Sequence, residues 1–195
     1  MSHLADMATL RPRVYLAGPE VFLPNAQQIG EQKKRICFRH GLEGVFPLDA
    51  VPDEAERPQD TGFAIFEICI SMMNDCQLAV ANLTPFRGVS MDIGTAIELG
   101  YMFGMHKPVF GYTNVIEDYM TRVEESDLGG ELQVEDFGLV DNLMCEGVIR
   151  RSGGEVIRRN VAPDARLSDL QGFEDCVRQA VRVLNRPEKE GARTG

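Results

Sequence analysis

The chain has 195 residues, of which 44% are hydrophobic and 26% are charged, a composition typical of a folded globular protein. Its formal net charge of −10, without any block of lysine or arginine, argues against nucleic acid and anionic membranes as partners and favours a neutral ligand. No apolar run is long enough to cross a bilayer, and the N-terminal segment lacks the apolar centre of a signal peptide.

Short apolar runs alternate with helical patterns through the first part of the chain. The runs cover residues 13–18, 44–50, 76–84 and 107–114, and the helical patterns cover 25–40, 62–74 and 92–105. Nearly continuous apolar runs bounded by turn residues indicate buried parallel strands. Strands that alternate with helices predict a parallel α/β sheet with right-handed crossovers.

The C-terminal part of the sequence has weaker signals. We predict a helix over 135–145, a turn over 147–154, a last strand over 154–157 and an amphipathic helix over 167–184. Neither a repeat nor a second set of elements is visible. We therefore expect a single domain over 11–186, with flexible tails at 1–10 and 187–195.

The five cysteines are scattered and form no CxxC pair, which is typical of reduced thiols in a cytoplasmic protein. The three histidines, His3, His40 and His106, have no spacing that supports a zinc site or a catalytic Cys–His or Ser–His pair. We expect a cytoplasmic location, no metal and no cofactor.

Ligands of parallel α/β sheets bind beyond the carboxyl ends of the strands, where the strand order reverses. After the first strand, "AGPEVF" places Gly18 and its backbone amides near a helix start. This arrangement suits a bound phosphate or a plain strand-to-helix turn. Glu20 would repel an anion, so both interpretations remain open.

Three carboxylates lie within otherwise apolar helical patterns. Asp92 begins the third helix, where it suits either an N-cap or a binding site. Glu98 lies among apolar neighbours, and burying it would cost several kcal/mol unless a polar pocket or solvent surrounds it. Glu67 lies in the middle of the preceding helix and has the same two interpretations.

Three segments together carry a family resemblance. "DCQLAVANLTPFRGVSMDIGTAIELGYMFGMHKPVFGYTN" resembles the central signature of the nucleoside 2-deoxyribosyltransferase family, "RVYLAGPEVFLPN" resembles its first strand and loop, and "FGLVDNLM" resembles its late helical segment. The similarity extends from about Arg13 to Met144. It implies a flavodoxin-like, doubly wound sheet of about five mostly parallel strands with helices on both faces.

The resemblance also implies a reaction. Glu98 in "AIELGY" matches the family nucleophile, which attacks the anomeric carbon of a 2-deoxynucleoside and forms a covalent deoxyribosyl-enzyme. A second nucleobase then attacks, so the configuration is retained, as in a retaining glycosidase. Tyr15 matches the tyrosine that orients this carboxylate, although a core strand residue is an equal alternative. The partners would be a 2-deoxynucleoside and a free nucleobase.

Asp92 matches the family carboxylate that holds the sugar 5′-hydroxyl. Related nucleotide N-glycosidases have serine there and accept a 5′-phosphate, which an aspartate would repel. Asn142 and Met144 match residues that reach into a neighbouring subunit's site, so the resemblance implies a homo-oligomer with shared active sites. An exposed Asn and a core Met are the ordinary alternatives.

The sequence departs from its relatives at several positions. Glu67 stands where relatives have Asp or Asn that contacts the base, and Phe22 stands where some have Trp, so it could stack on a base or lie in the core. Arg87 belongs to a longer loop and could cover the site or point into water. A hydrolase on the same scaffold and a non-catalytic nucleoside-binding module remain alternatives, and the preference between purine and pyrimidine is open.

Overall fold

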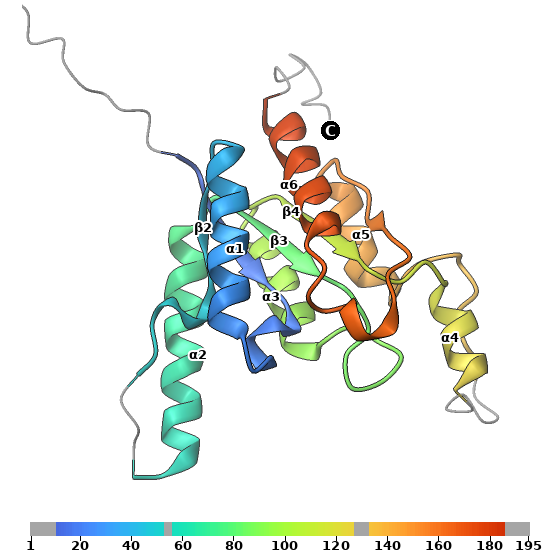
Figure 1. Ribbon diagram of the computed structural model, residues 1–195, viewed down its shortest axis with the longest axis horizontal. Coiled ribbons are helices and arrows are strands. Elements are labelled where there is room, and N and C mark those ends of the chain that lie inside the picture. Colours follow the sequence, from blue (N-terminus) through green and yellow to red (C-terminus); the bar gives the residue numbers. More distant parts are fainter. Residues whose placement is uncertain (1–10, 53–55, 127–132, 186–195) are drawn as a thin grey trace, which may run out of the picture.

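The computed structural model describes residues 11–52, 56–126 and 133–185 (Figure 1). Its single sheet has the strand order β2-β1-β3-β4-β5, and every neighbouring pair is parallel. The strands are β1 (Arg13–Ala17), β2 (Glu43–Val45), β3 (Leu78–Asn82), β4 (Val109–Thr113) and β5 (Ile157–Arg158). The expectation of a flavodoxin-like α/β sheet is confirmed, with all rather than most of the strands parallel.

Helices cover both faces of the sheet, as Figure 1 shows. One face carries α1 (Ala26–Arg39) and α6 (Gln171–Leu184). The other carries α2 (Pro58–Asp75), α3 (Ile93–Gly104) and α5 (Leu143–Arg151). Helix α4 (Tyr119–Glu125) and the 3-10 turns η1 (Pro19–Phe22), η2 (Pro47–Asp49) and η3 (Pro163–Ala165) complete the described elements.

Successive side chains of each strand point to opposite faces of the sheet, which divides the core into two layers. In β1, Val14 and Leu16 pack toward α1 and α6, whereas Tyr15 and Ala17 pack toward α2, α3 and α5. All residues of β3 and β4 are buried, because helices cover both faces of these central strands. This burial explains why the sequence of a central strand is a continuous apolar run rather than an alternating one.

The predicted helix over 135–145 is wrong. Helix α5 begins only at Leu143, and the chain before it is irregular. Gly138 has a φ of +65°, and the Asn142 side chain accepts a hydrogen bond from the Met144 amide at 3.0 Å, which starts the helix there. The predicted turn over 147–154 is also wrong in its first half, because α5 continues to Arg151 and the turn follows it.

Other elements differ from prediction only in their limits. The predicted strand over 44–50 ends at Val45, where a proline-initiated 3-10 turn replaces it, and the last strand lies at Ile157–Arg158 instead of 154–157. Helix α2 begins four residues early, at Pro58, and α6 begins at Gln171. Helix α4 was not predicted. The tails expected at 1–10 and 187–195 lie outside the described residues.

No helix in the described ranges is both long enough and apolar enough to span a membrane.

Candidate active site

The strand order places a topological switch point at β1 and β3. The chain leaves β1 toward β2 on one side, whereas β3 pairs with β1 on the other side, so the connections diverge there. Ligands of open α/β sheets bind at such a point, beyond the carboxyl ends of the strands. The segments that follow these two strands are residues 18–22 and residues 83–92, and the second leads into α3.

Tyr15 and Glu98 come together close to this point. The Tyr15 hydroxyl, on the buried side chain of a β1 residue, donates a hydrogen bond of 2.6 Å to Oε1 of Glu98 on α3. Glu98 itself is half-buried. The alternative of a fully solvated Glu98 is therefore wrong. Tyr15 is a buried core residue, as the other alternative has it, but its hydroxyl also binds Glu98.

The pKa of Glu98 is raised to about 7, chiefly because burial disfavours the charged carboxylate. The hydrogen bond from Tyr15 acts in the opposite direction, and the negative charge of Asp92 raises the pKa further. The pKa of Tyr15 is raised far above its usual range by burial and then by the Glu98 charge, so its hydroxyl remains a donor. The pair presents a poorly solvated carboxylate that one hydrogen bond holds in place.

Cys69 on α2 is a neighbour of this pair that the sequence did not indicate. Its thiol lies beside the Tyr15 hydroxyl, and its pKa is raised, mainly by burial. A cysteine in an apolar helix carries no signal beyond core packing. Only the contact between α2 and β1 reveals its position.

Asp92 is the N-cap of α3. Its Oδ2 accepts hydrogen bonds from the Thr95 amide at 2.9 Å and from the Thr95 hydroxyl at 3.0 Å. Among the described residues, its Oδ1 has no hydrogen-bond partner. One carboxylate oxygen therefore caps the helix, and the other can receive a hydroxyl.

Gly18 is required by close packing beneath the loop after β1. A Cβ at this position would lie 2.0 Å from Oε2 of Glu20 and 3.0 Å from Cβ of Asn82. Glu20 is fully buried, and its Oε1 accepts hydrogen bonds from Lys33, from Asn82 at 3.0 Å and from Tyr112 at 2.8 Å. The carboxylate that was expected to repel an anion is therefore neutralised inside the protein.

An aromatic pair, with one exposed and one half-buried ring, lies where the two segments meet. The rings of Phe22 and Phe86 stack with centroids 5.2 Å apart and planes 12° apart, and 53% of Phe22 remains exposed. The Arg87 guanidinium lies 4.7 Å from the centre of the Phe22 ring and 4.6 Å from that of Phe86. The core alternative for Phe22 is wrong, and Arg87 packs on the aromatic pair.

Three further predicted site residues are exposed and do not join the Tyr15–Glu98 pair in the described structure. Glu67 points outward from α2. Asn142 and Met144 lie at the start of α5, and 66% of Met144 is exposed, so its expected alternative as a core residue is wrong. The side chain of Asn142 caps its own helix.

Arg122 on α4 ties together the loops around the site. It donates hydrogen bonds to the carbonyls of Val89 at 3.0 Å, Glu117 at 2.6 Å and Val140. The adjacent Asp141 is buried and accepts a hydrogen bond of 2.7 Å from the Met91 amide. These bonds fix the loop that precedes Asp92 against the start of α5. Arg122 carries no signal in the sequence, because the pattern does not predict α4 itself.

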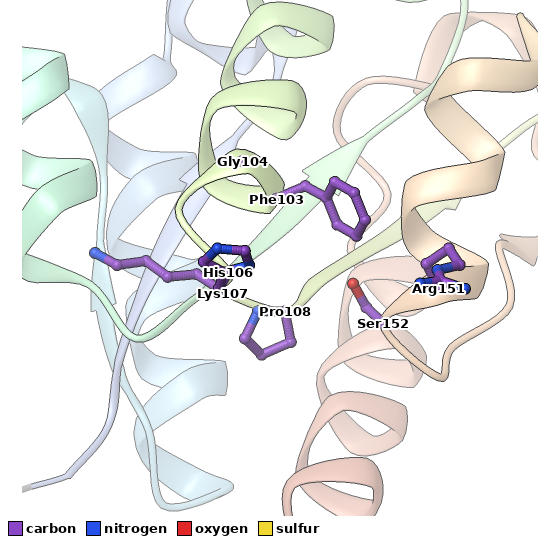
Figure 2. A pocket seen from close by; sticks show the side chains of 7 residues that line it. All are labelled: Phe103, Gly104, His106, Lys107, Pro108, Arg151 and Ser152. Carbon is purple, nitrogen blue, oxygen red and sulfur yellow. The ribbon is translucent and has the colours of Figure 1, made fainter. Parts of the chain in front are cut away.

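A cavity of about 570 Å³ lies at the other end of the strands, just before the start of β4 (Figure 2). Figure 2 shows Lys107 extending away from Arg151, and its Nζ donates to the carbonyls of Met73 and Asn74. Arg151 is the last residue of α5, where the helix dipole favours a cation, and His106 follows the end of α3. The end of α5 accounts for the position of Arg151.

Within residues 11–52, 56–126 and 133–185, no group of three or more His, Cys, Asp or Glu side chains is arranged to hold a metal ion.

The sequence model of the family described as nucleoside 2-deoxyribosyltransferase matches residues 14–144, more than half of the chain. The chain belongs to the nucleoside 2-deoxyribosyltransferase family. The matched range contains Tyr15, Asp92 and Glu98, and it ends at Met144.

Individual proteins are also similar to this chain. An uncharacterized protein of Schizosaccharomyces pombe is 36% identical over 169 residues, which cover 74% of this chain and 80% of the yeast protein. The solved structure of a 2-desoxiribosyltransferase from Leishmania mexicana has a TM-score of 0.55 at 29% identity and covers 69% of this chain and 85% of its own. A conserved protein from Enterococcus faecalis, with a TM-score of 0.50 at 17% identity over 86% of this chain and 98% of its own, shares the fold.

Proposed function

We propose that this protein transfers the 2-deoxyribosyl group between nucleobases through a covalent intermediate on Glu98, with retention of configuration. The observation that carries the proposal is the 2.6 Å hydrogen bond from Tyr15 to a half-buried Glu98 beside the switch point of the sheet. Family membership supports the reaction class. Binding alone has no need for a poorly solvated carboxylate held by a buried tyrosine.

The proposed chemistry uses the two oxygens of Glu98 differently. Oε1 accepts the Tyr15 hydrogen bond, and Oε2 attacks C1′ of the deoxynucleoside while the glycosidic C–N bond breaks and its electron pair leaves with the base. The departing base takes up a proton. A nitrogen of the second base then attacks C1′ and gives up its own proton, which balances the one that the first base took up, and the glutamyl ester bond breaks, so Glu98 regains its carboxylate. Two inversions at C1′ give overall retention.

Asp92 supports a nucleoside rather than a nucleotide as substrate. Its Oδ1, which has no partner in the described part of the chain, suits a hydrogen bond from the 5′-hydroxyl, whereas a 5′-phosphate dianion would be repelled by about 1–4 kcal/mol at roughly 4 Å in a partly wet site. Because Ser is also a good N-cap, Asp92→Ser removes the charge and preserves the start of α3. We expect this variant to lose nucleoside turnover and to discriminate less against 5′-monophosphates.

We further propose that the active protein is a homo-oligomer with shared sites. The helices α2, α3 and α5 expose large apolar side chains, which a neighbouring subunit would cover in such an assembly. These side chains are Phe63, Phe66, Ile93, Ile97, Leu143 and Met144. Asn142 and Met144 would then reach a neighbour's site. We also propose that residues 11–186 act as one domain and that the protein is cytoplasmic.

A hydrolase is the second candidate, because water can replace the acceptor base at the same intermediate. Incubation with deoxyinosine, with and without adenine, tests both. A transferase forms deoxyadenosine only when adenine is present, and a hydrolase releases deoxyribose in both reactions. Absence of both products would contradict an enzymatic function and favour a nucleoside-binding module.

A further inference from the structure

We propose that Arg87 recognises the edge of the nucleobase and makes this protein selective for 6-oxopurines, such as hypoxanthine and guanine, over adenine. The inference rests on the proposed function, because it names the base that the site would accept. It begins from the place of Arg87 in the fold. Phe22 follows β1 and Phe86–Arg87 follow β3, so the two segments flank the switch point at which a ligand of this sheet binds.

The surroundings of Arg87 leave its hydrogen-bond donors free. A backbone hydrogen bond of 2.9 Å from Phe86 to Ser90 closes the loop and puts Arg87 near its tip. The residue is exposed, and among the described residues its guanidinium has no hydrogen-bond or ion-pair partner apart from the two rings. A cation held against the exposed ring of Phe22 is available to a planar ligand that stacks on that ring.

The chemistry of the guanidinium selects the ligand. Arginine only donates hydrogen bonds, and its planar fork matches two neighbouring acceptors. Hypoxanthine and guanine present such a pair, N7 and O6, whereas adenine presents N7 beside an amino donor. Stacking on Phe22 and Phe86 is tolerant of base identity, so Arg87 supplies the discrimination.

The test compares three donor nucleosides that differ at the purine 6-position. They are deoxyinosine, with an oxygen; purine 2′-deoxyriboside, with hydrogen; and deoxyadenosine, with an amino group. Consumption of each is measured as kcat/KM, counting both transfer and hydrolysis. Calorimetric titration with hypoxanthine, purine and adenine measures how the same three 6-substituents change the binding affinity, without any turnover.

Four proteins are compared: the unmodified chain, Arg87→Met, Arg87→Lys and the control Arg11→Met. Methionine keeps an apolar stem over the rings and removes every donor, whereas lysine restores one point donor. Arg11 is a matched control, because it also lies over a phenylalanine ring, that of Phe38 at 3.7 Å, before the amino end of β1. Comparing ratios between proteins cancels the intrinsic reactivity of the three nucleosides.

We expect deoxyinosine to exceed deoxyadenosine by roughly tenfold or more in the unmodified protein, with purine 2′-deoxyriboside in between. Arg87→Met should reduce the ratio to about 2-fold or less, Arg87→Lys should give an intermediate ratio, and Arg11→Met should keep the original one. A preference for adenine, or a ratio that survives Arg87→Met, would overturn the inference. Base discrimination in calorimetry without consumption of any nucleoside would refute the proposed function while leaving the role of Arg87 supported.

Discussion

Two opposing effects set the pKa of Glu98. Burial, with a smaller contribution from the negative charge of Asp92, raises it to about 7, and the Tyr15 hydrogen bond limits that rise by stabilising the charged form. A nucleophilic carboxylate must be ionised, so we expect activity to increase as the pH rises through about 7. The poor solvation that raises the pKa also leaves the ionised oxygen ready to attack.

Tyr15→Phe tests this balance at a single atom. Loss of the hydroxyl removes a bond that favours the ionised form, so the rising limb of the kcat/KM–pH profile, which reports the free enzyme, should move to higher pH. A hydrogen bond to a charged group contributes about 1.5–3 kcal/mol, which corresponds to a fall in kcat of about 10- to 100-fold. An unmoved limb would show that Tyr15 does not control the ionisation of Glu98.

At the residue scale, the sequence predicted the site only in part. Resemblance paired Tyr15 with Glu98, and the hydrogen bond between them agrees with that pairing. Cys69 and Arg122 were missed, because their roles depend on which helix faces which loop and not on local pattern. Arg87 was left open for the same reason.

At the element scale, prediction succeeded where burial imposes a simple pattern. Strands β1, β3 and β4 are apolar because helices cover both faces, and turn residues bound them. The prediction of a helix over 135–145 is wrong, because side-chain caps decide where the helix begins, whatever the spacing of the apolar residues before it. Asn142 starts α5, and Asp141 uses its carboxylate to bind the Met91 amide in another segment, a contact invisible in sequence.

The loop after β1 depends on an ion pair that lies wholly inside the protein. Glu20 and Lys33 are both fully buried, and Lys33 lies 5.0 Å from the ring centre of Phe173. Removing one partner leaves an uncompensated buried charge, which costs about 3–5 kcal/mol. Glu20→Gln should therefore lower the free energy of unfolding by that amount in urea denaturation.

Two further variants distinguish this effect from a general loss of charge. Glu20→Gln combined with Lys33→Met removes both charges and should recover part of the lost stability. Asp60→Asn breaks the exposed pair with Arg57 and should cost no more than about 1 kcal/mol. Equal losses in Glu20→Gln and Asp60→Asn would contradict the role given to the buried pair.

At the scale of the whole molecule, shared sites predict complementation between two inactive variants. Glu98→Ala removes the nucleophile, and Asn142→Ser removes the amide proposed to reach the neighbour while keeping an N-cap for α5. In an equal mixture, each site combines subunits at random, so about a quarter of the sites receive both intact residues. Activity should recover to about a quarter of the original value.

Native mass spectrometry must show that the subunits have exchanged. Exchange without recovery of activity would place Asn142 in its own chain's site or in none. A fully active monomer in sedimentation would exclude shared sites altogether.

The central claim is that Glu98 forms a bond to the sugar, and intact-mass spectrometry measures this bond directly. A 2-fluoro-substituted 2-deoxynucleoside slows both steps, because fluorine withdraws electrons from a transition state with positive charge on the sugar. The unmodified protein should gain the mass of one fluorosugar per chain, peptide mapping should place it on Glu98, and an added acceptor base should remove it. An adduct of equal yield on Glu98→Ala, or one mapped to another residue, would contradict the account.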